Sequence, residues 1–314
     1  MASLFINPAQ ILKANASDLL TDLDLTDDEL LYLLDLAAEV KRTPQDFAHA
    51  LSGKSIALLF EKPSLRTKLT FELAIKQLGG DSVASDGPVG VREPLKDVAR
   101  NLDRWVNGIV ARVFSHATVK ELARWSSVPV INALCDAYHP CQALADVQTL
   151  RERFGELRGR KLAFIGDGNN VAQSLMLSAS RLGMDFSLGC PEGFMPDPEV
   201  VAQAEGLAAI SGATVEVVHE AASAVKGAHA VYTDVWASMG QEDQAARRRS
   251  AFRAFQVNEK LMSKAESDAI FMHCLPAKRG EEVTDAVMES AASVVFDQAE
   301  NRLHAQKALL LMML

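Results

Sequence analysis

The chain has 314 residues, of which 48% are hydrophobic and 23% are charged, which is enough to bury a large core and to form two domains. The formal net charge of −9 argues against a nucleic-acid-binding surface. The basic stretch 247–249 is too short to change this, and we interpret it as a solvated face.

Four cysteines occur in the chain: Cys135, Cys141, Cys190 and Cys274. They lie far apart and lack the paired spacing of zinc ligands, so we expect neither a disulfide framework nor a metal site, and a cytoplasmic protein. Segment 1–12 has no basic region and no long apolar run, so we expect no secretory signal and a mature protein that starts here. The apolar run 308–314 is too short to cross a bilayer and should end a packed helix.

The first half of the chain alternates strand-like and helix-like segments. Thr26 and Glu29 form a capping-box pattern before a leucine-rich helix. The predicted strands are residues 55–60, 81–84, 108–113 and 129–132. The predicted helices between them lie near residues 67–78, 94–105 and 118–125. This pattern is typical of a parallel α/β unit.

The pattern starts again at Arg160. The predicted strands of the second half are residues 161–166, 185–189, 214–218, 230–234, 269–273 and 293–296. We therefore predict an α/β protein of two domains, each a parallel sheet flanked by helices. The first domain spans 1–141, with the C-terminal helix, about 298–314, packing back on it. The second spans 142–297, with 142–154 as the interdomain helix and an active-site cleft between the domains.

The turn after the first predicted strand carries Ser64, Arg66 and Thr67 at the start of a helix. Helix N-termini favour anions, and hydroxyls with a guanidinium in the same turn would bind a phosphate from several sides. The alternative is that Ser64 only caps the helix and Arg66 is a surface charge. His139 and Gln142 open another helix and could bind a carbamoyl or amide group, or His139 could be a buried histidine satisfied by backbone.

Further polar residues follow the strands of the second half. The run 166–170 resembles a dinucleotide fingerprint, but Val171 stands where its third glycine belongs, which favours a small polar substrate at Asn170. Asp234 and Ser238 would suit the ammonium and the carboxylate of an amino acid, although Asp234 could instead bond its own turn. Cys274 follows a strand and Arg302 lies in the last helix; alone, these would be an inert thiol and a surface ion pair.

Together and in this order, the segments Ser-Leu-Arg-Thr, His-Pro-Cys-Gln, Ser-Met-Gly and His-Cys-Leu-Pro closely resemble the carbamoyltransferases, and within them the branch that acts on ornithine. The resemblance covers essentially the whole chain. It implies that phosphate is bound by Ser64, Leu65, Arg66 and Thr67. It implies that the carbamoyl group is held by Arg112, His139, Gln142 and Arg302, with Cys274 and Leu275 lining the reaction centre. It implies that ornithine is held by Asn170, Asp234, Ser238 and Met239.

The implied reaction is attack by the neutral side-chain amine of ornithine on carbamoyl phosphate, giving citrulline and phosphate, with no metal or organic cofactor. Arg112, His139 and Arg302 would stabilise the developing oxyanion. Asp234 and Cys274 would assist deprotonation of the amine. The family also implies homotrimers, or higher assemblies of trimers, in which loop 86–96 of a neighbour brings Arg92 or Lys96 to the phosphate.

The chain departs from the family pattern at two positions. Pro88 stands where many relatives have a phosphate-contacting Gln. Leu65 stands where most ornithine enzymes have Thr, and the Ser-Leu-Arg-Thr form occurs in relatives that act on acylated ornithines. The alternatives are therefore a carbamoyltransferase for N-acylornithine or putrescine, a silent binding protein on the same fold, and a nicotinamide dehydrogenase. Asp234 and the Ser-Met-Gly turn favour ornithine.

Overall fold

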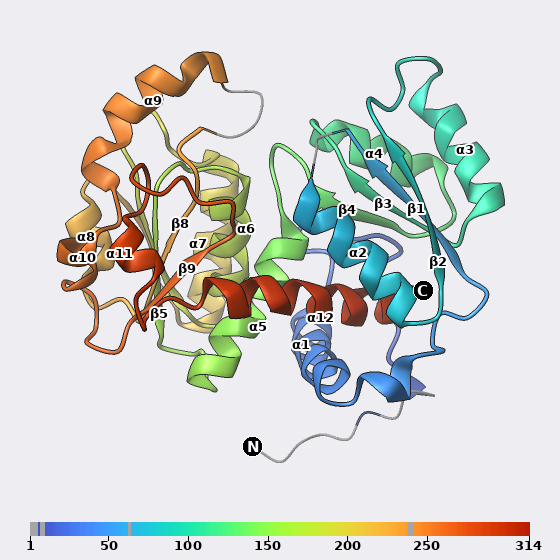
Figure 1. Ribbon diagram of the computed structural model, residues 1–314, viewed down its shortest axis with the longest axis horizontal. Helices are drawn as coiled ribbons and strands as arrows, with labels where there is room; N and C mark the ends of the chain where they lie inside the picture. The colour runs from blue at the N-terminus through green and yellow to red at the C-terminus, as the bar shows by residue number, and fades with distance from the viewer. Residues whose placement is uncertain (1–5, 7–9, 62–63, 238–241) are drawn as a thin grey trace. The chain divides into compact units, whose positions relative to one another are not determined.

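The computed structural model describes residue 6 and residues 10–61, 64–237 and 242–314. It confirms an α/β protein with two parallel sheets flanked by helices (Figure 1). The chain forms two compact units, one made of Met1–Gln148 with Glu300–Leu314 and the other of Thr149–Ala299. The boundaries between the units fall inside two helices, α5 (Pro140–Phe154) and α12 (Val295–Met313).

The sheet of the first unit has four strands in its described part, in the order β2-β1-β3-β4. They are β1 (Ser55–Phe60), β2 (Asp81–Asp86), β3 (Gly108–Arg112) and β4 (Val130–Leu134), all parallel. β3 and β4 are buried along their whole length and β1 beyond its first residue, as continuous apolar runs in a parallel sheet require. β2 is an edge strand whose side chains are mostly exposed.

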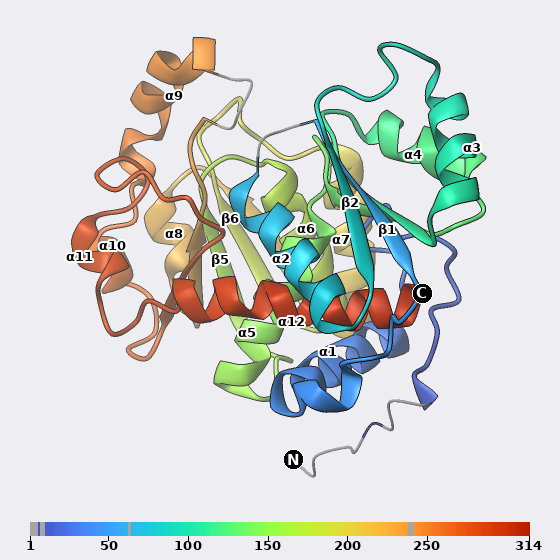
Figure 2. The same ribbon diagram turned by 45° about the vertical axis from the view of Figure 1, so that its right-hand side comes forward.

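Helices flank this sheet on both faces. They are α2 (Leu65–Gln77) on one face and α3 (Leu95–Trp105) and α4 (His116–Trp125) on the other (Figures 1 and 2). The unit also contains α1 (Asp27–Arg42) and the short helix η2 (Pro44–Phe47). The core between the sheet and α3 and α4 is built from small and branched side chains, such as Ala99, Ile109 and Val119.

The sheet of the second unit has five strands in its described part, in the order β7-β6-β5-β8-β9. They are β5 (Lys161–Ile165), β6 (Asp185–Gly189), β7 (Val215–Val218), β8 (Ala230–Thr233) and β9 (Ile270–His273), again all parallel. The longer helices are α6 (Asn170–Arg181), α7 (Pro198–Ser211) and α9 (Ala245–Phe252). Shorter ones are α8 (Ala221–Val225), α10 (Glu259–Met262), α11 (Asp285–Met288), η3 (Glu242–Gln244) and η4 (Arg253–Phe255).

Each sheet contains a point where the strand order reverses. In the first unit the chain moves from β1 to β2 on one side and then returns to β3 on the other side of β1. In the second it moves from β5 through β6 to β7 and then returns to β8 beside β5. The loops that leave the two central strands diverge at such a point and leave a crevice at the carboxyl ends of the strands. These two places are where ligand-binding residues are expected.

The predicted strand at 293–296 is wrong. Only a single parallel bridge forms, between Phe271 and Ser293, with the Val294 N–H donating to the Phe271 carbonyl at 3.0 Å. The Gln298 N–H then donates to the Val294 carbonyl, so the chain turns into α12 at Val295 before a second pair can form. A run of three apolar residues, 294–296, cannot by itself distinguish a strand from the first turn of a helix.

The apolar end of the chain is the last part of α12, where residues 308–312 are buried. The Met312 carbonyl accepts the Ala14 N–H at 3.0 Å, so the N-terminal arm is bonded to this helix. Among the described residues, none of the helices combines the length and the hydrophobicity that a bilayer crossing requires.

The capping box predicted at the start of α1 is confirmed. The Thr26 side chain accepts the Glu29 N–H, and Glu29 Oε2 accepts the Thr26 N–H at 2.8 Å. Glu29 Oε1 also accepts the backbone N–H and the side-chain amide of Asn15. Burial raises the pKa of Glu29, but these hydrogen bonds outweigh burial and hold the pKa below its ordinary value. The carboxylate therefore ties the N-terminal arm to the helix.

We expect Glu29→Gln to lower the free energy of unfolding by about 1 kcal/mol at neutral pH, because Gln keeps one acceptor oxygen but turns an NH₂ toward N–H donors that the other carboxylate oxygen accepts. Because the folded-state pKa is depressed, this contribution is fully present above the unfolded pKa and is lost as pH falls through the folded value. The difference from wild type in chemical unfolding should therefore shrink below about pH 4. Asp28→Asn, an exposed acid in the same helical turn, is the control and should show little change. An equal loss for Glu29→Gln at both pH values would contradict this account.

Candidate active site

The turn after β1 begins α2 with a capped N-terminus. The Ser64 side chain accepts the Thr67 N–H at 3.3 Å, so Ser64 caps the helix. Helix capping was one of the two interpretations of Ser64 from the sequence. This role is compatible with anion binding, because the remaining N–H groups of the first helical turn still point out of the helix end. Leu65 is the first residue of α2 and its side chain is 71% exposed, whereas Arg66 is half-buried.

Two buried arginines converge on Thr67. Its hydroxyl oxygen accepts Arg112 Nη1 at 3.2 Å and Arg302 Nη2 at 2.6 Å. Arg112 ends β3 directly opposite Phe60 of β1, and Arg302 lies on α12. All three residues are at least nine-tenths buried. Bringing two guanidinium groups to one hydroxyl in a buried place is electrostatically costly, and an anion bound there would offset that cost.

His139 and Gln142 lie where β4 leads into α5. The His139 carbonyl accepts the N–H groups of Gln142 and Ala143, so it opens the helix. Gln142 Nε2 donates to Asp146 Oδ1 at 2.8 Å, and both residues are buried. Gln142 Oε1 is buried without a hydrogen-bond partner among the described residues. Asp146 therefore fixes the amide so that Gln142 offers an acceptor, which suits the NH₂ of a carbamoyl group.

Cys141 stands between these two residues but is not a chemical participant. It is buried, and its Sγ donates to the Asn132 carbonyl at 3.4 Å. Burial raises the pKa of Cys141 to about 12, so its thiol stays protonated at neutral pH.

In the second unit, the loop after β5 holds Gly168, Asn169 and Asn170. A Cβ on Gly168 would lie 2.2 Å from the backbone nitrogen of Pro196, so this glycine serves close backbone packing and not a pyrophosphate. Asn169 caps α6, because its Oδ1 accepts the N–H groups of Val171 and Ala172. Asn170 is the first residue of the helix and is half-buried.

Asp234 leaves β8 beside this loop and accepts three hydrogen bonds from residues that the structure describes. Oδ2 accepts Asn169 Nδ2 at 2.9 Å. Oδ1 accepts Cys274 Sγ at 3.0 Å and the Val235 N–H at 2.7 Å. The hydrogen bond from the Val235 N–H agrees with the alternative interpretation from the sequence, in which Asp234 bonds the backbone of its own turn. The bonds to Asn169 and Cys274 show that the carboxylate is also part of a cluster from three strand ends.

Cys274 and Leu275 follow β9 in a tight turn. Leu275 has a left-handed backbone, with φ of 58°, and its N–H donates to His273 Nδ1 at 2.8 Å. His273 Nδ1 therefore carries no proton, and Nε2 donates to Glu282 Oε1 at 3.1 Å. This makes His273 a neutral imidazole that supports the turn. Sequence reasoning missed both His273 and Glu282, because nothing in their spacing identifies the pair.

Atoms of Asp234, His273 and Cys274 that could coordinate a metal ion lie within 4.8 Å of one another. In the described structure His273 is hydrogen-bonded at both ring nitrogens, and Cys274 donates to Asp234. Because these bonds use the atoms that would face an ion, we interpret the group as a hydrogen-bonded cluster and assign no metal to it.

A buried ion pair supports the same loop. Arg248 Nη1 donates to Asp167 Oδ2 at 2.6 Å and to the Trp236 carbonyl at 3.0 Å, and its guanidinium lies 5.0 Å from the Phe194 ring centroid. Burial raises the pKa of Asp167, although Arg248 opposes this shift. The interpretation of 247–249 as a solvated face is therefore wrong for Arg248, which is 7% exposed, and holds for its exposed neighbours.

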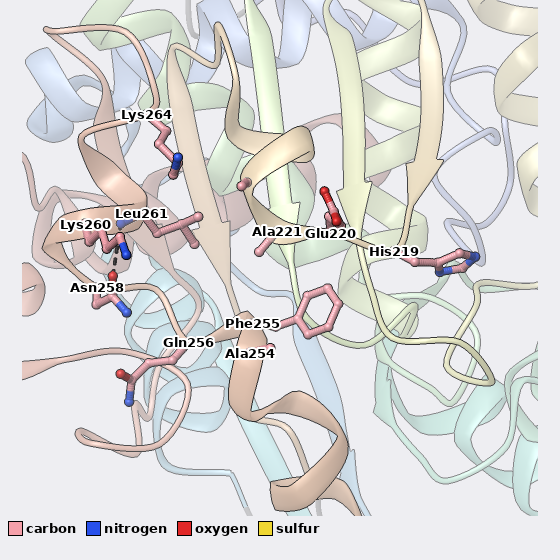
Figure 3. A pocket seen from close by; sticks show the side chains of 11 residues that line it. His219, Glu220, Ala221, Ala254, Phe255, Gln256, Asn258, Lys260, Leu261 and Lys264 are labelled. Carbon is pink, nitrogen blue, oxygen red and sulfur yellow. Dashed lines mark hydrogen bonds between the residues drawn. The ribbon is translucent and has the colours of Figure 1, made fainter.

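The remaining predictions concern residues that are exposed or not described. Ser238 and Met239 lie outside the described residues. Arg92 and Lys96 are exposed, and so is Pro88. A hollow of about 370 Å³ in the second unit is lined by none of the predicted site residues that the structure describes. Its lysines and His219 lie apart along it and do not converge, so we assign it no ligand (Figure 3).

The comparison with protein families identifies both halves of the chain. The carbamoyl-P binding domain of aspartate/ornithine carbamoyltransferase matches residues 17–152, and the Asp/Orn binding domain of the same family matches residues 158–313. The chain therefore belongs to the aspartate/ornithine carbamoyltransferase family and is a carbamoyltransferase. This confirms the resemblance that the sequence motifs indicated.

Individual relatives show which members of this family the chain resembles. The chain is 55% identical over 263 residues to the ornithine carbamoyltransferase of Thermococcus kodakarensis, covering 83% of this chain and 84% of that protein. It is 49% identical to the solved ornithine carbamoyltransferase of Pyrococcus furiosus, with a TM-score of 0.91, covering 95% of this chain and 96% of that one. A solved acetylornithine transcarbamylase, complexed with acetylcitrulline, is 35% identical with a TM-score of 0.86, covering 95% of this chain and 99% of that one.

Proposed function

We infer that the protein carries out the ornithine carbamoyltransferase reaction: it transfers the carbamoyl group of carbamoyl phosphate to the side-chain amine of L-ornithine, giving L-citrulline and phosphate, a step of arginine metabolism. The convergence of Arg112 and Arg302 on Thr67 is the observation that carries this inference, because it prepares a buried place for an anion. Sequence identity favours ornithine over an acylated ornithine, at 49% for the solved ornithine carbamoyltransferase of Pyrococcus furiosus against 35% for the solved acetylornithine transcarbamylase.

For carbamoyl phosphate, we propose that Ser64, Leu65, Arg66 and Thr67 hold the phosphate. Leu65 would act through its backbone N–H, since its side chain is 71% exposed, so the departure from Thr does not remove a phosphate ligand. Arg112, His139 and Arg302 would stabilise the negative charge that develops on the carbamoyl oxygen. Gln142 Oε1 would accept a hydrogen bond from the carbamoyl NH₂.

For ornithine, we propose binding by Asn170 and Asp234, with Ser238 and Met239 assigned by family resemblance alone. Asp234 would accept hydrogen bonds from an amino group of ornithine, and Cys274 and Leu275 would line the reaction centre. The neutral side-chain amine attacks the carbonyl carbon, the bond from that carbon to the phosphate oxygen breaks, and the nitrogen loses a proton. Asp234 and Cys274 would assist that proton loss, and the hydrogen bond between them supports this role. The reaction requires no metal or organic cofactor.

The surface of the first unit supports the proposed homotrimer, or higher assembly of trimers. Leu65, Leu69 and Leu73 recur every four residues along α2 and are 71%, 46% and 44% exposed. Val83 of the adjoining edge strand β2 is 65% exposed, and Lys68 and Asp86 join the two elements at 2.6 Å. An apolar stripe beside an exposed edge strand is typical of an interface. Loop 86–96, with Arg92 and Lys96, would reach the phosphate of the neighbouring copy.

We also propose a cytoplasmic location. None of the four cysteines forms a disulfide bond in the described structure, and three of them are buried. A reducing compartment keeps such thiols reduced.

The substrate assignment is tested by product formation from carbamoyl phosphate with L-ornithine, N-acetylornithine, N-succinylornithine, putrescine and aspartate in parallel. We expect citrulline from L-ornithine and little product from the other amines. Preference for an acylated ornithine would mean that Leu65, and not Asp234 with the Ser-Met-Gly turn, indicates the substrate. Absence of product with every amine would indicate that the protein is a catalytically silent binding protein on the same fold.

The division of the site is tested by Arg66→Ala and Asp234→Asn. Each removes a charge-assisted hydrogen bond, so we expect the KM of one substrate to rise at least about tenfold. Arg66→Ala should act on carbamoyl phosphate, and Asp234→Asn on ornithine. Steady-state kinetics with each substrate varied in turn measures this. Equal effects on both KM values in each variant would refute the proposed roles.

The assembly is tested by Leu69→Glu combined with Leu73→Glu. Two carboxylates in the apolar stripe of α2 would oppose its burial, so we expect the mass measured by light scattering to fall from trimer to monomer. Ile210→Glu, at a residue of α7 that is 85% exposed, is the matched control and should leave the mass unchanged. A trimer that persists in the double variant would exclude this stripe as the interface.

A further inference from the structure

We propose that Asn169, which neither the family motifs nor our sequence analysis assigned, is a positioning residue for the amino-acid substrate and orients Asp234 through its side-chain amide. The inference rests on the proposed roles of the second unit. Its observation is one hydrogen bond, from Asn169 Nδ2 to Asp234 Oδ2 at 2.9 Å. This bond joins the loop after β5 to the end of β8, at the point where the strand order reverses.

The orientation of the Asn169 amide is fixed by the helix it caps. Its Oδ1 accepts the N–H groups of Val171 at 3.0 Å and Ala172 at 3.1 Å. A flipped amide would place its NH₂ against these two donors and lose both bonds. The NH₂ group of Asn169 therefore has to face Asp234, because the N-terminus of α6 fixes the orientation of the amide.

The hydrogen bond from Asn169 determines which acceptor position of the Asp234 carboxylate remains for a substrate. A carboxylate offers about four acceptor positions, two on each oxygen. Oδ1 already accepts the Cys274 thiol and the Val235 N–H, and Oδ2 accepts Asn169. Among the described groups, the remaining position lies on Oδ2 beside Asn169. An amino group bound by Asp234 is thus directed to a defined place.

The charges around Asp234 leave it as the carboxylate that faces the substrate. Asp167, in the same loop as Asn169, is paired with Arg248 at 2.6 Å. His273 is neutral, with its Nε2 proton directed at Glu282. Cys274 is a hydrogen-bond donor to Asp234. Asn169 contributes no charge, so it orients Asp234 without changing the attraction of the site for a cation.

The alternative is that Asn169 serves only as a helix cap. Asn169→Asp separates the two roles, because aspartate caps a helix as well as asparagine, but an ionised carboxylate cannot donate to Asp234. It also places a second carboxylate beside the first, so the pair binds a proton at a higher pH than an isolated carboxylate would. The protonated form of the new acid can donate to Asp234 as the amide did.

We expect Asn169→Asp to melt within a few degrees of wild type and to keep the KM of carbamoyl phosphate within about twofold. The KM of ornithine at pH 8 should rise at least about tenfold, from the lost bond and the like charge. The ratio of kcat/KM for ornithine, variant over wild type, should recover as the pH is lowered, because protonation restores the donor. Taking the ratio at each pH cancels the titration of the ornithine amine itself.

Asn258→Asp is the matched control. Asn258 caps α10 in the same unit by accepting the Leu261 N–H at 3.0 Å, and no predicted site residue lies in that helix. It should leave both KM values and their pH profiles unchanged. Asn169→Ser is the second variant: it keeps a capping oxygen, lacks the amide donor and adds no charge, so its ornithine KM should rise by a factor that does not change with pH.

The outcomes are distinguishable. Inactivity of the wild-type protein with ornithine would refute the proposed function itself. Full wild-type activity with unchanged ornithine KM in both Asn169 variants would refute only the role of Asn169. A fall in melting temperature with equal loss for both substrates would likewise show that Asn169 is a structural cap. A selective, pH-reversible loss in Asn169→Asp supports the proposal.

Discussion

The reversal of strand order in each parallel sheet is the constraint on which the candidate site depends. A parallel sheet needs crossover connections, and a sheet that grows in both directions from one strand must place neighbouring loops on opposite faces. In the first unit this separation lies between β1 and β3, and it puts the Ser64 turn next to Arg112. In the second it lies between β5 and β8, and it puts Asn169 next to Asp234. The same topological feature therefore gathers polar side chains of different chemistry at two places.

The two places differ in charge because different side chains occupy the strand ends. In the first unit Arg112 and Arg302 converge on the hydroxyl of Thr67, which prepares a site for an anion. In the second unit Asp234 is a carboxylate held by uncharged donors, while the nearby Asp167 is paired with Arg248. Such preorganised charges cost free energy and favour a charged ligand that offsets the cost. In the proposed function, the anionic carbamoyl phosphate and the positively charged ammonium group of an amino acid are the ligands that match them.

Much of the fold followed from the sequence because its signals are local. Continuous apolar runs predicted buried parallel strands, and the pattern of Thr26 and Glu29 predicted the start of α1. The segment after Ala292 was misjudged because a short apolar run has no period long enough to separate a strand from a helix. Arg248 was misjudged because its burial depends on Asp167, which is 81 positions earlier in the chain. Gln142 lies in the first turn of a helix, as the sequence indicated, but the orientation of its side chain depends on Asp146.

The sequence by itself determined the class of fold, the chemical types gathered at the strand ends and the family, since periodicity and motif order are properties of the chain. Only the tertiary structure decided which groups meet. It directed Arg302 of the last helix to Thr67, 235 positions away, and it aimed the Asn169 amide at Asp234. It also fixed the proton of His273 through Leu275 and Glu282. The physical reason is that hydrogen bonding and desolvation act over a few ångströms in space, whatever the separation along the chain.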